Sequence, residues 1–135
     1  MAKAIELIQG IGPEYGKLLS EANCNSPAAL LKSGASKKGR KALAAQTGIS
    51  ETVILKLVNM ADLFRIKGIS SQYAELLKAS GVDTVKELRK RKPENLAAAM
   101  KATNAEKKLC KQVPGVSMVE TWVNQAKSLD PVVTH

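Results

Sequence analysis

Aromatic residues and histidine are scarce in this chain of 135 residues. Phe, Trp and Tyr together make up 3% of the sequence, and the single histidine is His135. A core must therefore be built from Leu, Ile, Val, Ala and Met, and few side chains can stack on nucleic-acid bases. The two cysteines, Cys24 and Cys110, form no Cys-x-x-Cys pair, so neither a zinc nor an iron–sulfur site is expected. We interpret them as free thiols in a reducing compartment.

The sequence also lacks the motifs of common enzymes. No glycine-rich loop ends in Gly-Lys-Ser/Thr, and no carboxylates are paired at helical spacing beside an evident cleft. We therefore expect no enzyme, no bound metal and no cofactor. Since the sequence contains neither an apolar run of membrane-spanning length nor a recognisable signal peptide, we expect a cytoplasmic protein without a membrane partner.

Positive charge is what the chain has in excess. It contains 21 Lys and Arg against 12 Asp and Glu, a formal net charge of +9 at pH 7. Such an excess attracts polyanions through its long-range field. Many basic proteins bind no nucleic acid, so the charge alone does not define a partner.

A phrase of twelve residues occurs twice, 58 residues apart. Residues 8–19 read IQGIGPEYGKLL, and residues 66–77 read IKGISSQYAELL. Each copy has an apolar residue, a Gly-Ile-Gly or Gly-Ile-Ser turn, and then the start of a helix. That order is the pattern of a helix-hairpin-helix.

The agreement between the halves continues beyond this phrase. Asn23 and Gly81 suit the left-handed residue that ends a helix, while Ser26 and Thr84 suit the N-cap of the next helix. Thr84 and Glu87 also have the spacing of a capping box. The second half has a few extra residues, which we place around 102–111.

Each half closes with a second, weaker hairpin pattern, at residues 45–50 and 111–117. In the later one, Ser117 and Glu120 predict a capping box at the start of the last helix.

The whole pattern predicts an all-α fold of two tandem helix-hairpin-helix pseudo-repeats, packed as one compact helical unit. The repeats span residues 1–62 and 63–135, and residues 130–135 are expected to form a short tail.

The chemistry expected of such a hairpin is anion binding. Glycine allows close approach of the backbone, and the first turn of the following helix leaves N–H groups without partners. Together with the helix dipole, these groups bind phosphate without reading base sequence. We expect Gly10–Gly12 to be the better site, because the Cβ of Ser70 narrows access in the other copy. The alternative is that the hairpins only pack helices.

We predict a nucleic-acid-binding set made of the two main turns and the basic residues near them. The basic runs are either a solvated face or a patch that follows phosphates, and binding through such a patch weakens steeply with salt. The candidates are Gly10, Ile11, Gly12, Lys17, Lys37, Lys38, Arg40, Lys41, Lys67, Gly68, Ser70, Arg89, Lys90, Arg91 and Lys92.

One enzymatic comparison favours a protein without catalysis. Helix-hairpin-helix DNA glycosylases of the lyase type carry a lysine two residues after the second hairpin glycine. This chain has Glu14 there and, in the repeat, Gln72.

With these residues in hand, the chain resembles a mostly bacterial family of small helix-hairpin-helix proteins that is catalogued as a domain of unknown function. The resemblance covers nearly the whole chain and brings no assigned activity. It rests on residues 11–15, 38–40, 47–50, 57–63 and 82–88.

More broadly, each half resembles the paired helix-hairpin-helix modules of DNA repair, recombination and transcription proteins. That resemblance implies contact with the DNA backbone across the minor groove, sometimes with a monovalent cation held by hairpin carbonyls. Ser70 and Ser71 depart from the pattern in the second half.

The leading hypothesis is therefore a non-catalytic protein that contacts the phosphate backbone of nucleic acid, duplex DNA first and RNA as the alternative, with little sequence preference. The rival hypothesis is a helical scaffold that binds another protein. An accessory subunit of a larger nucleic-acid machine would combine the two. The oligomeric state is left open.

Overall fold

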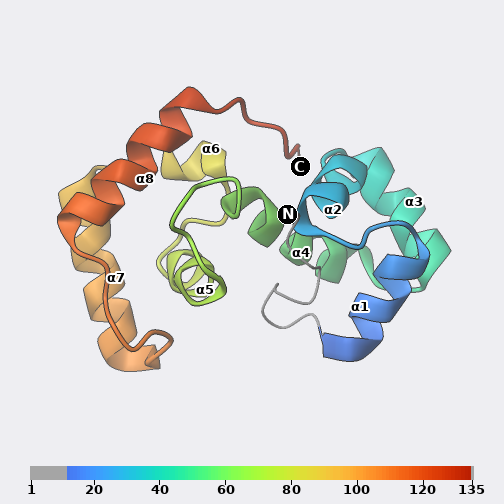
Figure 1. Cartoon of the computed structure of the whole chain (residues 1–135), viewed down its shortest axis with the longest axis horizontal. Coiled ribbons are helices and arrows are strands. Elements are labelled where there is room, and N and C mark those ends of the chain that lie inside the picture. The colour runs from blue at the N-terminus through green and yellow to red at the C-terminus, as the bar shows by residue number, and fades with distance from the viewer. Residues whose placement is uncertain (1–11, 135) are drawn as a thin grey trace. The chain divides into compact units, whose positions relative to one another are not determined.

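The computed structural model describes residues 12–134, which form eight α-helices and no strand (Figure 1). The all-α prediction is thus confirmed for the described residues. The contacts divide the chain into two compact units. Unit 1 ends at Asp62 but also includes Val132–Thr134, and unit 2 is Leu63–Pro131. The predicted repeats assign residues 132–134 to the second half, whereas in the structure they belong to unit 1.

Unit 1 contains the first four helices, and the last residue of the fourth falls in unit 2. They are α1 (Gly12–Glu21), α2 (Pro27–Gly34), α3 (Lys37–Thr47) and α4 (Glu51–Leu63). Unit 2 contains the other four, which are α5 (Ser71–Ala79), α6 (Val85–Leu88), α7 (Pro93–Lys107) and α8 (Val116–Ser128). The most extensive packing between helices joins α7 to α8 and α2 to α3, and both pairs lie side by side in Figure 1.

The ends of α1 and α5 have the same hydrogen-bond pattern. Asn23 has φ 65° and Gly81 has φ 96°, which confirms the predicted left-handed residues. In the next position, the Cys24 amide donates to the Leu19 carbonyl at 2.8 Å, and the Val82 amide donates to Leu77 at 2.8 Å. Each pair of equivalent groups is 58 residues apart, the spacing of the sequence repeat.

The helices that follow begin with the predicted caps. Ser26 Oγ accepts from the Ala29 amide at 3.1 Å, ahead of Pro27 at the first helical position. Thr84 Oγ1 accepts from the Glu87 amide at 3.3 Å. The turns after α1 and α5 are therefore each followed by a helix that is capped at its start by a hydroxyl side chain.

The predicted capping box at Ser117 is wrong. Gly115 takes the extended N-cap conformation, with φ −75° and ψ 166°, so α8 begins at Val116 and carries no side-chain cap. Ser117 lies inside the first turn, where its carbonyl accepts from Thr121 Oγ1 at 3.1 Å.

Helix α7 has 15 residues against 11 in α3, and the loop of residues 108–115 connects it to α8. Asn104 holds the loop, because its Nδ2 donates to the Cys110 carbonyl at 3.0 Å and its Oδ1 accepts from the Cys110 amide at 2.8 Å. All four polar groups are buried, so the side chain replaces the backbone partners that an irregular loop lacks.

The core of each unit is aliphatic, as the scarcity of aromatic residues requires. Leu19, Leu30, Ile54 and Val58 are fully buried in unit 1. In unit 2 the fully buried side chains include Leu63, Ile66, Leu76, Leu77 and Leu88. Trp122, which is 2% exposed, is the one aromatic residue among the largest buried side chains of the described residues.

Candidate functional site

A side chain of α8, Gln125, fixes the start of the turn at Gly68–Ser70 through two hydrogen bonds. Gln125 Oε1 accepts from the Lys67 amide at 2.9 Å, and Gln125 Nε2 donates to the Lys67 carbonyl at 3.1 Å. Gly68 has φ 95°, and a Cβ built on it would come within 3.0 Å of Trp122 Nε1. The glycine therefore serves two purposes here, a left-handed backbone and close packing on the indole.

The two residues after Gly68 differ in their surroundings. Ile69 is buried in the core. Ser70 is the N-cap of α5, and its Oγ accepts from the Tyr73 amide at 3.4 Å. The hydroxyl thus takes one of the amides that a phosphate would otherwise use, and this reduces the capacity of the second copy for an anion.

Of the first turn, Gly10 and Ile11 lie outside the described residues. Gly12 is the first residue of α1, and Lys17 is exposed one turn further along that helix. Gly16 and Ala74 are both buried, which agrees with a need for small residues at this point of α1 and α5.

The two weaker turns are more open than the Gly68 turn. A Cβ built on Gly48 or on Gly115 meets no atom of residues 12–134 within 4 Å. Ahead of α4, Ser50 Oγ accepts from the Val53 amide at 3.3 Å. At the start of α8, nothing in the described part of the chain accepts from the amides of residues 116–118. Helix α8 therefore has the less occupied N-terminus of the two.

The basic run on α3 is divided between the surface and the interior. Lys37, Lys38 and Lys41 are exposed, whereas Arg40 is only 4% exposed. Arg40 Nη1 donates to the carbonyls of Gly34 at 2.9 Å and Ala35 at 3.0 Å. Arg40 is thus a structural residue of unit 1 in this conformation, and three lysines remain for an external anion.

Sequence analysis missed this role of Arg40, although a signal was present. Arg40, Leu43 and Thr47 are spaced by three and four residues, and all three lie on the buried face of α3. A charged residue on an apolar face indicates an internal partner more often than a surface contact.

The basic run after α6 is divided in the same way. Lys90 and Lys92 are exposed, and Arg89 is half-buried. Arg91 Nη2 donates to the Gly81 carbonyl and to Glu87 Oε1, both at 3.1 Å. Arg91 therefore braces the left-handed turn after α5, and its salt bridge is half-exposed and worth little by itself.

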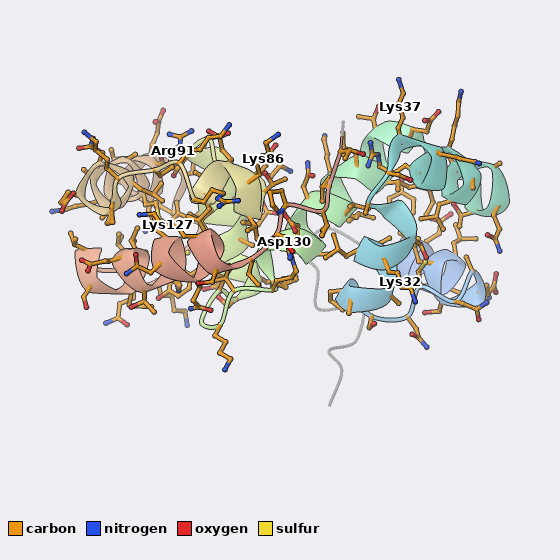
Figure 2. All side chains as sticks on the ribbon, turned by 90° about the horizontal axis from the view of Figure 1, so that it is seen from above. Lys32, Lys37, Lys86, Arg91, Lys127 and Asp130 are labelled. Carbon is orange, nitrogen blue, oxygen red and sulfur yellow. The ribbon has the colours of Figure 1, made fainter. Side chains whose placement is uncertain are left out.

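Unit 2 carries the larger share of the positive charge. Residues 63–131 contain 13 Lys and Arg against 7 Asp and Glu, a net +6. In Figure 2 the side chains of Lys86 and Arg91 project toward the same edge of this unit. Lys86 is exposed, whereas Arg91 is bonded to Gly81 and Glu87, so the exposed lysines of the unit are the cations that raise the local concentration of an anionic ligand.

A shallow groove lies at the same point of each unit, between its third helix and the start of its fourth. Three of the five residues that line the groove in unit 1 are charged, against two of the eight that line the groove in unit 2. Unit 1 uses Lys37, Arg40, Glu51, Thr52 and Leu55. Unit 2 uses Glu94, Ala97, Ala98, Lys101 and residues 113–116. Val116, which lines the second groove, and Met118 are among the few large apolar side chains exposed in the described residues.

No cluster of three or more His, Cys, Asp or Glu that could hold a metal occurs among the described residues. Burial raises the pKa of the Cys110 thiol, whose Sγ donates to the Gln72 carbonyl at 3.2 Å. Among residues 12–134, no helix combines the length and the apolar character needed to cross a membrane.

Comparison with known proteins places the chain in one family. The family model named domain of unknown function DUF4332 matches residues 9–129, so the chain belongs to that family. No curated protein and no solved structure matches the chain.

Proposed function

We propose that this protein binds the phosphate backbone of nucleic acid, duplex DNA first, without catalysing a reaction on it. Its two units are then tandem helix-hairpin-helix pseudo-repeats, each with a main turn and a weaker one. The observation that carries the proposal is the glycine turn at the start of α8, where Gly115 is exposed and no group among the described residues accepts from the amides of residues 116–118. Lys101 lines the same groove as Gly115, and the net charge of +6 on this unit raises the local concentration of phosphate.

Two further features support this proposal. The hydrogen bonds that end α1 and α5 recur at a spacing of 58 residues, as a duplicated scaffold requires. Lys37 lines the groove between α3 and α4, and Lys38 and Lys41 are exposed on the same helix α3. Backbone amides and lysines bind phosphate but carry no base information, so the proposed binding has little sequence preference.

The test is a titration of a labelled DNA duplex at low and moderate salt, with an RNA duplex in parallel. The informative variant is Gly115→Asp. Aspartate is a preferred N-cap and interacts well with the helix dipole, so α8 is kept or stabilised. The carboxylate nevertheless repels a phosphate at the same place, and we expect the affinity to fall about tenfold.

The matched control is Ala102→Asp, which changes the charge equally at an exposed position of α7. Equal affinity of the two variants, or no binding of any duplex at low salt, would contradict the proposal. Contacts with several phosphates also require the logarithm of the affinity to fall linearly with the logarithm of salt concentration.

A second candidate function is a protein-binding module, and the mostly apolar groove of unit 2 favours it. Val116, which is exposed, and Val113 line that groove. This function predicts that Val113→Ser removes a partner that survives nuclease treatment and leaves duplex binding unchanged.

A further inference from the structure

The segment Val132–Thr134, called here the return segment, is bound to the end of α2. The Thr134 amide donates to the Ala35 carbonyl at 2.8 Å, and Thr134 Oγ1 donates to the same oxygen at 3.4 Å. Arg40 Nη2 donates to the Thr134 carbonyl. Both backbone groups of Thr134 are therefore paired with unit 1.

Side chains of the return segment alternate between the surface and the interior. Val132 is 37% exposed, while Val133 is 7% exposed and is part of the core. Thr134 is exposed again. This alternation is typical of an extended peptide bound along a surface, with every second side chain in contact.

Arg40 connects this peptide to the helix beside it. Its Nη1 donates to Gly34 and Ala35, and its Nη2 to Thr134, so the buried guanidinium is satisfied by backbone carbonyls on two sides. A buried cation is tolerated only when its N–H groups have partners. The end of α2 supplies the acceptors of Nη1, and the return segment supplies the acceptor of Nη2.

We propose that unit 1 contains a binding site for an extended peptide, formed by the end of α2 and by Arg40, and that the return segment is its resident ligand. The site recognises a backbone N–H at the Ala35 carbonyl, a backbone C=O at Arg40, and an apolar side chain one residue earlier. Because the chain leaves unit 1 at Asp62 and returns at Val132, occupation of this site closes unit 2 into a loop tied at both ends.

Occupation also has a consequence for charge, and this step rests on the proposed function. The bound segment keeps Arg40 inside unit 1, next to the exposed lysines of α3. Release leaves Arg40 Nη2 without its carbonyl acceptor, and because Arg40 lines the same groove as Lys37, this nitrogen can then donate to a phosphate bound there. The return segment is thus an internal competitor of the anion.

The experiment compares Val133→Asp with Val132→Asp in the full chain. The two variants introduce the same charge at adjacent positions, one buried and one exposed. We expect the Thr134 amide to exchange with solvent about tenfold faster or more in Val133→Asp, and to keep its protection in Val132→Asp. Trp122 emission, which reports on unit 2, is expected to be the same in both variants.

A second arm uses a chain that ends at Pro131 together with a synthetic peptide of residues 128–135. Addition of the peptide should shift the amide resonances of Ala35 and Arg40, and the same peptide with Val133→Asp should not. Rapid exchange of the Thr134 amide in the unaltered chain, or identical exchange in the two variants, overturns the site.

Titration with a DNA duplex tests the competition with a phosphate separately from the existence of the peptide site. Tighter binding by Val133→Asp than by Val132→Asp supports the competition between the segment and a phosphate, and equal binding overturns it. If no form of the chain binds a duplex, the proposed function fails, while exchange at Thr134 still decides whether the peptide site exists.

Discussion

Replacement of Gly68 by alanine tests whether the turn and α8 fit together as described. The backbone has φ 95° at this position, a conformation that costs an L-residue about 1–2 kcal/mol. The new Cβ would also lie 3.0 Å from Trp122 Nε1, and the indole cannot move freely because it is 2% exposed and packs on Tyr73 with ring centroids 5.2 Å apart. We expect a total loss of about 2–3 kcal/mol in the stability of unit 2.

The assay is urea unfolding followed by the emission of Trp122, the single tryptophan of the chain. With an m-value of about 1–3 kcal/mol per molar urea, the midpoint should fall by roughly 1 M. Gly115→Ala is the control, because its φ is −75° and its Cβ meets no atom of the described residues within 4 Å. A midpoint for Gly68→Ala within about 0.2 M of the control would refute the packing argument.

Two further predictions concern unit 2. Asn104→Ala leaves the buried amide and carbonyl of Cys110 unpaired and should cost about 3 kcal/mol in urea unfolding, whereas Asn95→Ala, exposed on the same helix, should cost little. Burial raises the pKa of the Cys110 thiol, so its thiolate fraction near pH 8 is smaller than that of a free cysteine. Alkylation of Cys110 at pH 8 should therefore be slow in the folded chain and become fast in urea, and a rate equal to that of a free thiol in the folded chain would contradict this burial.

The local features of the fold could be predicted from sequence because each is decided within a few residues. Asn23 and Gly81 end their helices in the left-handed conformation, and Ser26 and Thr84 begin the next ones. Glycine and short polar residues are unfavourable inside a helix and favourable at its ends, so at these positions they indicate where a helix starts or stops. Ser117 shows the limit of the method, because a neighbouring glycine took the N-cap position and moved the start of α8.

The contacts that shape the candidate site could not be predicted, because they join residues far apart in the chain. Gln125 pairs with Lys67 across 58 positions, and Arg40 pairs with Thr134 across 94. From the sequence pattern, Lys67 and Arg40 can be recognised only as positively charged residues near a turn. Their backbone and guanidinium partners depend on how α8 and the return segment pack, and no local spacing encodes that packing.

The chain order of unit 1 bears on how the protein is made. Domains generally fold as units during synthesis, with the N-terminal part first. Here the ribosome produces α1 to α4, then all of unit 2, and only afterwards Val132–Thr134. The unit whose synthesis begins first is therefore completed last, and a nascent chain stalled before residue 132 would hold a fully encoded unit 2 beside an Arg40 that still lacks its carbonyl partner.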